Sequence, residues 1–200
     1  MKLSIFSKFF QYPPCNIWLI LGPSGAGKSH FSRFLAGYKN LLHLEVDQFS
    51  IEGLGSHDKR GIDIHNLKWE WILFYRIKRG KPLVKEIIRR YERAKREGAI
   101  LSFPSTIILS STRIRALPQG VKVIYLFGER QFCANSFLHR ERGLRRAIGL
   151  RDWEHYNNSI YAALEDPALR PYAVDVFNQD GTHKAPATIY DQIMKDIYGV

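Results

Sequence analysis

Residues 22–29 combine glycines, a lysine and a serine at the spacing of a phosphate-binding loop. They read Gly-Pro-Ser-Gly-Ala-Gly-Lys-Ser, which is a complete G-x-x-x-x-G-K-S motif. The glycines let the backbone curl so that successive N–H groups point at a phosphate. Lys28 can reach the β- and γ-phosphates of a nucleotide, and the Ser29 hydroxyl can hold Mg²⁺. The residues predicted to bind the nucleotide are Gly22, Ser24, Gly25, Ala26, Gly27, Lys28 and Ser29.

Asp47 is the second residue whose position indicates chemistry. It follows residues 41–46, which predict a second strand. In a doubly wound sheet, ligands gather at the carboxyl ends of the strands. The Asp47 carboxylate is therefore predicted to accept the proton of an attacking hydroxyl, to orient that hydroxyl, or to hold Mg²⁺ through water. The alternative interpretation is a cap for a turn, because Asp often follows a strand.

Four arginines near residue 140 form a third group with chemical potential: Arg140, Arg142, Arg145 and Arg146. Phosphoryl transfer develops negative charge on the transferred group, and guanidinium groups stabilise that charge. Spacing alone does not decide which of the four points inward. The segment resembles the mobile arginine lid of small-molecule kinases, which implies that Arg140 and Arg142 are catalytic residues, and a closing lid would also exclude water from the site. The alternative is a basic helix face in contact with solvent.

The elements that must position these residues alternate between strands and helices. Residues 16–21, which are apolar after Asn16, predict a buried strand, and residues 30–36 predict a helix that stops at Gly37. The further predicted strands are 41–46, 99–102, 106–109, 121–127 and 172–177, and the further predicted helices are 66–77, 83–97, 129–147, 153–165 and 188–197. This alternation predicts an α/β fold with a parallel sheet that helices cover on both faces.

Length and composition favour one domain with a full core. The chain has 200 residues, of which 45% are apolar and 24% charged, as in ordinary globular proteins. Cys15 and Cys133 lie far apart without metal or redox spacing, which indicates free thiols in an intracellular protein. The sequence predicts no signal peptide and no membrane span. We therefore expect a cytoplasmic protein with no membrane partner.

The net charge of +11 calls for a partner or a ligand. Basic residues gather in two regions, 76–96 and 130–151. A solvated helix face is the usual meaning of such a cluster, while nucleic-acid binding is the alternative, because phosphate contacts are made by basic patches.

The chain resembles the uridine kinase and nucleoside-kinase-like branch of the P-loop kinases. The resemblance rests on residues 22–29, on 46–49, on 69–73 with 79–82, and on 138–143 followed by 151–152. It implies a three-layer P-loop fold with a five-stranded parallel sheet, an acceptor-binding insert at about 48–98 and a lid at about 129–152. It also implies ATP and Mg²⁺ as cofactors, with Ser29 and Asp47 at the metal. Residues 178–181 resemble the loop that contacts adenine in related kinases, although an ordinary turn reads the same way.

One position departs from the pattern of this family. Relatives carry an acidic residue at the end of the third strand, where this chain has Ser102 followed by Phe103, Pro104 and Ser105. Without that carboxylate, Mg²⁺ would depend on Ser29, Asp47, phosphate oxygens and water, which Mg²⁺ tolerates because it keeps several waters.

These observations predict an ATP- and Mg²⁺-dependent kinase that phosphorylates a hydroxyl of a small molecule, a nucleoside or a related sugar-containing metabolite. Two alternatives stay open. One is a kinase that acts on nucleic-acid ends, because of the basic charge. The other is a nucleotide-binding regulatory protein with little catalysis, because of Ser102. The sequence leaves the oligomeric state open.

Overall fold

The computed structural model describes residues 15–45, 81–103, 105, 108–115, 117–144 and 148–199. Several sequence predictions fall elsewhere in the chain. Asp47, the helix at 66–77, most of the predicted insert, Arg145 and Arg146 lie outside the described residues.

Five parallel strands form one sheet in the order β2-β3-β1-β4-β5. The strands are β1 (Ile17–Leu21), β2 (Leu41–Glu45), β3 (Gly98–Ser102), β4 (Val121–Phe127) and β5 (Ala173–Asp175). All residues of β1 and β3 are buried, because strands in the middle of a parallel sheet are covered on both faces. The predicted α/β fold with a five-stranded parallel sheet is confirmed.

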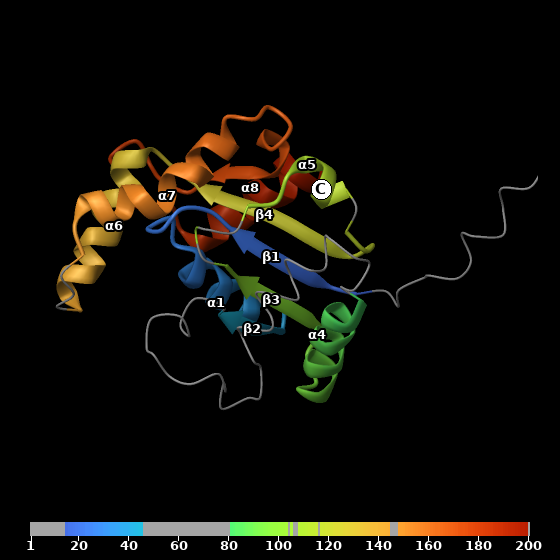
Figure 1. Cartoon of the computed structure of the whole chain (residues 1–200). Helices are drawn as coiled ribbons and strands as arrows, with labels where there is room; N and C mark the ends of the chain where they lie inside the picture. The colour runs from blue at the N-terminus through green and yellow to red at the C-terminus, as the bar shows by residue number, and fades with distance from the viewer. Residues whose placement is uncertain are drawn as a thin grey trace, which may run out of the picture.

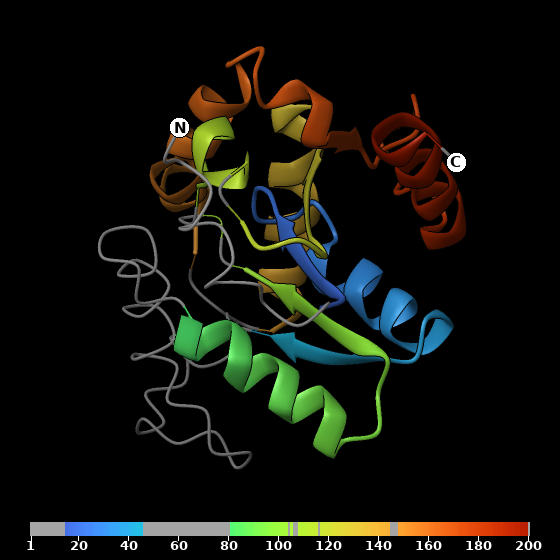
Figure 2. The same ribbon diagram turned by 90° about the vertical axis from the view of Figure 1, so that its right-hand side faces the viewer.

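Helices cover both faces of this sheet. They are α1 (Lys28–Tyr38), α4 (Lys81–Arg93), α5 (Ser111–Arg115), α6 (Arg130–Gly143), α7 (Leu150–Leu164) and α8 (Pro186–Tyr198), with a short 3₁₀ helix, η2 (Arg170–Tyr172). Residues of α1 and α8 share one apolar cluster with one face of the sheet, and residues of α4 and α5 share another with the opposite face. Figure 2 shows α4 in green and α1 in blue on opposite sides of β2 and β3.

The remaining two helices, α6 and α7, lie at one end of the sheet. Figure 1 shows them beyond the arrowheads of β1 and β4, which mark the carboxyl ends of these strands. This helix pair packs in the same apolar cluster as α1 and α8, through Cys133 and Phe137 of α6 and Trp153 of α7. The predicted lid region is therefore helical in its described part, and its two helices are anchored to the body of the protein.

Helix α1 does not stop at Gly37, so that prediction is wrong. The helix continues to Tyr38, and the backbone turns at Asn40, which has a φ of +50°. Phe31 and Leu35 are buried on the sheet side of α1. Packing of that apolar face outweighs the intrinsic cost of about 1 kcal/mol that a glycine adds inside a helix.

The predicted strand at 106–109 is wrong for its described residues, 108 and 109, which belong to no strand. The Tyr125 hydroxyl accepts a hydrogen bond from the Leu109 N–H at 2.7 Å and donates to the Leu109 carbonyl at 2.9 Å. A side chain thus satisfies both backbone groups that a strand would pair. Nearby, α5 is a short helix that the sequence pattern did not indicate. Within the described residues, no helix is long and apolar enough to cross a bilayer.

Candidate active site

The phosphate-binding motif forms the loop that joins the central strand β1 to α1. Gly22, Gly25 and Gly27 have φ angles of +136°, +94° and +74°, which other residues rarely adopt. A Cβ at Gly22 would lie 1.9 Å from the carbonyl oxygen of Leu126, and one at Gly25 would lie 1.9 Å from that of Cys133. The glycines therefore allow the loop to approach the backbones of β4 and α6 closely.

The N-terminus of α1 faces this loop without a capping side chain. Gly27 is the N-cap residue and no side-chain cap hydrogen bond is present. The first N–H groups of a helix lack intrahelical partners, and this helix end carries a partial positive charge. Phosphate oxygens can take the place of a capping side chain there. The arrangement thus fits a phosphate group. Ser29 lies in the first turn of α1, and its role as a Mg²⁺ ligand stays a prediction.

Lys28 turns its side chain back into the loop. Its Nζ donates hydrogen bonds to the carbonyl oxygens of Gly22 and Pro23, both at 2.9 Å, and the residue is buried. A buried ammonium group needs such partners because burial without them is costly. The positive charge of Lys28 is therefore held where a nucleotide phosphate would enter the loop.

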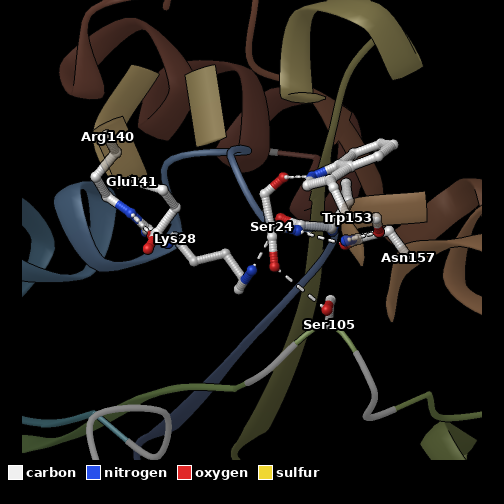
Figure 3. Close-up of polar contacts among 8 residues, drawn as sticks. Ser24, Lys28, Ser105, Arg140, Glu141, Trp153 and Asn157 are labelled. Atoms are coloured by element: carbon white, nitrogen blue, oxygen red, sulfur yellow. Dashed lines mark hydrogen bonds and ion pairs between the residues drawn. The ribbon is translucent and has the colours of Figure 1, made fainter. Parts of the chain in front are cut away.

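Ser24 connects the loop to α7 and to the segment after β3, as Figure 3 shows. Its N–H donates to Oδ1 of Asn157 at 2.7 Å, and its carbonyl oxygen accepts from the Trp153 indole N–H at 2.9 Å. Its hydroxyl lies 3.3 Å from the hydroxyl of Ser105, which in turn lies 3.4 Å from the carbonyl oxygen of Tyr156. All three polar groups of Ser24 are thus engaged by the protein.

The segment after β5 also reaches the phosphate loop. His183 Nε2 lies 3.0 Å from the carbonyl oxygen of Gly25, and because a carbonyl only accepts, this nitrogen carries the proton. The His183 ring packs on Phe177 with 4.3 Å between ring centroids. An isolated antiparallel bridge joins the same two residues and closes the turn at 178–182. His183, just after this turn, thus reaches the phosphate loop, and the contact of residues 178–181 with adenine stays a prediction.

Arg140 and Arg142 lie at the C-terminal end of α6. Arg140 donates two hydrogen bonds to Oε1 of Glu141, at 2.9 and 2.7 Å, and its guanidinium lies 5.1 Å from the Phe137 ring centroid. Glu141 is 1% exposed, whereas both arginines are exposed. Arg140 thus pairs with the buried carboxylate of Glu141. The catalytic role of Arg140 and Arg142 stays a prediction.

Ser102 ends β3 beside the phosphate loop, at the position where an acidic residue was expected. Phe103 N–H donates to the carbonyl oxygen of Ile20, at the end of β1, and the Ser102 hydroxyl lies 3.0 Å from Nε2 of His43 on β2. Among the described residues, no group of three or more His, Cys, Asp or Glu side chains gathers in one place. Asp47 lies outside the described residues, and its role stays a prediction.

No protein-family model and no curated protein matches the chain. Solved structures to which the chain is similar include a gluconokinase from Sinorhizobium meliloti 1021, which is 19% identical over 93% of both chains, with a TM-score of 0.48. A sugar kinase from Janibacter sp. HTCC2649 is 15% identical over 92% of this chain and 95% of its own, with a TM-score of 0.47. Shikimate kinase from Acinetobacter baumannii, in complex with shikimate, is 17% identical over 92% of this chain and 94% of its own, with a TM-score of 0.46. This likeness concerns the fold, and the uridine kinase branch stays a prediction.

Three residues at the site escaped the sequence analysis: Trp153, Asn157 and His183. Trp153 and Asn157 are four residues apart, so they share one face of a helix. An asparagine on the apolar face of a predicted helix is a signal that could have been noticed, because buried polar side chains need partners. His183 carried no such signal, since its partner lies 158 residues away in the sequence.

Proposed function

We propose that the chain is an ATP- and Mg²⁺-dependent kinase that phosphorylates a hydroxyl group of a small molecule, a nucleoside or a related sugar-containing metabolite. The observation that carries the proposal is the conformation of residues 22–29. They join the carboxyl end of β1 to an uncapped helix N-terminus, with the Lys28 ammonium turned inward. Ligands gather at this edge of a parallel sheet, and this loop geometry suits phosphate.

In the proposed reaction, the acceptor oxygen forms a bond to the γ-phosphorus of ATP while the bond to the β–γ bridging oxygen breaks. Bound Mg²⁺ would supply neutralisation of the phosphate charge. Lys28 and the loop N–H groups hold the β- and γ-phosphate oxygens, and the Ser29 hydroxyl is the proposed metal ligand. Asp47 is the proposed acceptor of the hydroxyl proton, and Arg142 of the lid stabilises charge on the transferred group.

Lys28→Ala provides the direct test. The parent chain should consume ATP in the presence of Mg²⁺ and one member of a panel of nucleosides, sugars and other alcohols. Lys28→Ala should reduce this turnover by at least a hundredfold, because one charge-stabilising donor commonly contributes that much. Lys195→Ala, which makes the same change at an exposed position of α8, is the matched control. Transfer by Lys28→Ala at the parental rate would refute the proposal.

An exposed basic surface favours a nucleic-acid substrate as the second candidate. Arg89, Arg93, Lys95 and Arg96 are exposed on α4 and just after it. Binding through phosphate contacts weakens steeply as salt is added. A fluorescently labelled 20-nucleotide RNA should therefore bind tightly at 50 mM salt, and far more weakly at 200 mM, if this candidate is correct. Absence of binding at 50 mM salt removes it.

A further inference from the structure

The backbone on both sides of Ser24 is fixed by α7. The peptide group between Pro23 and Ser24 is held by its N–H, which donates to Asn157 Oδ1 at 2.7 Å. The next peptide group is held by its carbonyl, which accepts from the Trp153 indole at 2.9 Å. Each hydrogen bond fixes the rotation of one peptide plane. Gly25, which follows directly and adopts a φ of +94°, would otherwise leave this part of the loop free to rotate.

Asn157 is buried, and both ends of its carboxamide form hydrogen bonds that fix its orientation toward Ser24. The residue is 1% exposed, and its Nδ2 donates to the carbonyl oxygen of Trp153 at 2.6 Å. That bond fixes which end of the carboxamide faces Ser24, because the oxygen and the nitrogen cannot exchange places without losing both contacts. Trp153 is equally buried at 1% exposed and packs in the apolar cluster beneath the loop.

The contacts from α7 differ from the contact that Lys28 makes. The Lys28 ammonium binds the carbonyl oxygens of Gly22 and Pro23, and in the proposed reaction the same ammonium binds phosphate. The Pro23 carbonyl belongs to the peptide group whose N–H is held by Asn157. When Lys28 turns to phosphate, this peptide group keeps its bond to Asn157, since that bond does not involve the ligand.

We propose that Asn157 and Trp153 are positioning residues that hold the phosphate loop in its anion-binding shape without touching the nucleotide. The inference rests on the proposed function, in that the ligand of the loop is taken to be a nucleoside triphosphate. It assigns the Ser24 N–H to Asn157 rather than to phosphate and leaves phosphate binding to the N–H groups nearer α1. The affinity for nucleotide falls as the fraction of loops in the competent shape falls.

The test measures the dissociation constant of MgADP for Asn157→Leu, Asn157→Ala and Trp153→Phe. Each variant removes one hydrogen bond to Ser24. Asn158→Leu and Asn158→Ala make the same changes at the exposed neighbouring position and are the controls. We expect MgADP to bind at least tenfold more weakly to the Asn157 and Trp153 variants at a temperature where their circular dichroism is that of the parent. The controls should bind within twofold of the parent.

Nucleotide binding separates this inference from the proposed function. If the parent and the Asn157 variants bind MgADP equally, the positioning role is wrong while the kinase proposal stands. If the parent binds neither MgADP nor MgATP, the proposed function fails, and the positioning role fails with it. Should Asn157→Leu not fold, Asn157→Ala and Trp153→Phe are judged by the same tenfold criterion. In an active parent, the KM for ATP should rise more than kcat falls, because Asn157 acts before the chemical step.

Discussion

The hydroxyl of Ser102 lies 3.0 Å from Nε2 of His43. Ser102 ends β3, where a carboxylate was expected, and His43 is the middle residue of β2. The strands are in register there, with His43 opposite Ile100 and Glu45 opposite Ser102. Glu45 itself faces α1, where its carboxylate lies 3.6 Å from the Arg33 guanidinium. The described end of β3 therefore offers a neutral hydroxyl rather than a charged group to a metal ion.

Ser29 and Ser102 should differ in their effect on Mg²⁺. Mg²⁺ prefers oxygen ligands in octahedral geometry, and in proteins it commonly joins a hydroxyl and phosphate oxygens with several waters. We expect Ser29→Ala to raise the Mg²⁺ concentration that half-saturates ADP binding by about tenfold or more. Ser102→Ala should change it by less than threefold. A magnesium titration of fluorescent ADP binding measures both, and equal effects would place the metal nearer β3 than we propose.

Gly25→Ala and Gly37→Ala should change stability in opposite directions. A methyl group at Gly25 would lie 1.9 Å from the Cys133 carbonyl oxygen, and the backbone there has a φ of +94°, which alanine rarely adopts. We therefore expect Gly25→Ala to lower the free energy of unfolding by about 3–5 kcal/mol. A methyl group at Gly37 has no atom within 4 Å and lies in a helix, so a gain of about 0.5–1 kcal/mol is expected. Urea denaturation measures both values. A stable Gly25→Ala protein would contradict the described contact between the loop and α6.

The sequence revealed the fold because its strongest patterns are local. The apolar run ending at Leu21, the glycine motif and the periodicity of the helices each depend on neighbouring residues. The end of α1 was misplaced at Gly37 because tertiary packing of Phe31 and Leu35 extends the helix. The contacts of Ser24 with Trp153 and Asn157 join residues about 130 positions apart. Such pairs follow from how α7 packs on the loop, and no local pattern contains that information.

We expect Arg140 to contribute to stability and Arg142 to contribute to catalysis. Arg140 partners a carboxylate that is 1% exposed, so Arg140→Ala should lower the free energy of unfolding by about 1–3 kcal/mol. Arg142→Ala should alter stability by less than about 0.5 kcal/mol but reduce kcat roughly a hundredfold, because its exposed guanidinium is available to the transferred phosphoryl group. Steady-state kinetics and urea denaturation on both variants test this. A larger loss of kcat in Arg140→Ala would reverse the assignment.

Ionisation of the Cys133 thiol should lower the stability of the protein at alkaline pH. Burial raises the pKa of its thiol from 9.0 to about 11, with partial opposition from the Tyr161 hydroxyl. Because the pKa is higher in the folded state, this contribution to stability is fully present below pH 9 and is lost as pH rises from 9 to 11. Linkage gives a loss of about 1.4 kcal/mol by pH 10 from this group. Tyr125, whose pKa burial raises to about 12, adds to the decline from about pH 10 upward.

Cys133→Ala isolates the thiol contribution, because the comparison is between two pH values within each protein. The difference in unfolding free energy between pH 8 and pH 10 should be smaller in Cys133→Ala than in the parent by about 1 kcal/mol, whatever the cost of the substitution itself. Cys15→Ala is the comparison variant: burial also raises the pKa of that thiol, but the Lys122 ammonium opposes the effect, so the pH dependence should change less than in Cys133→Ala. Urea denaturation under reducing conditions gives the two free energies of each of the three proteins. Equal pH dependence in the parent and Cys133→Ala would mean that the thiol ionises alike in the folded and unfolded states, which the complete burial of Cys133 does not allow.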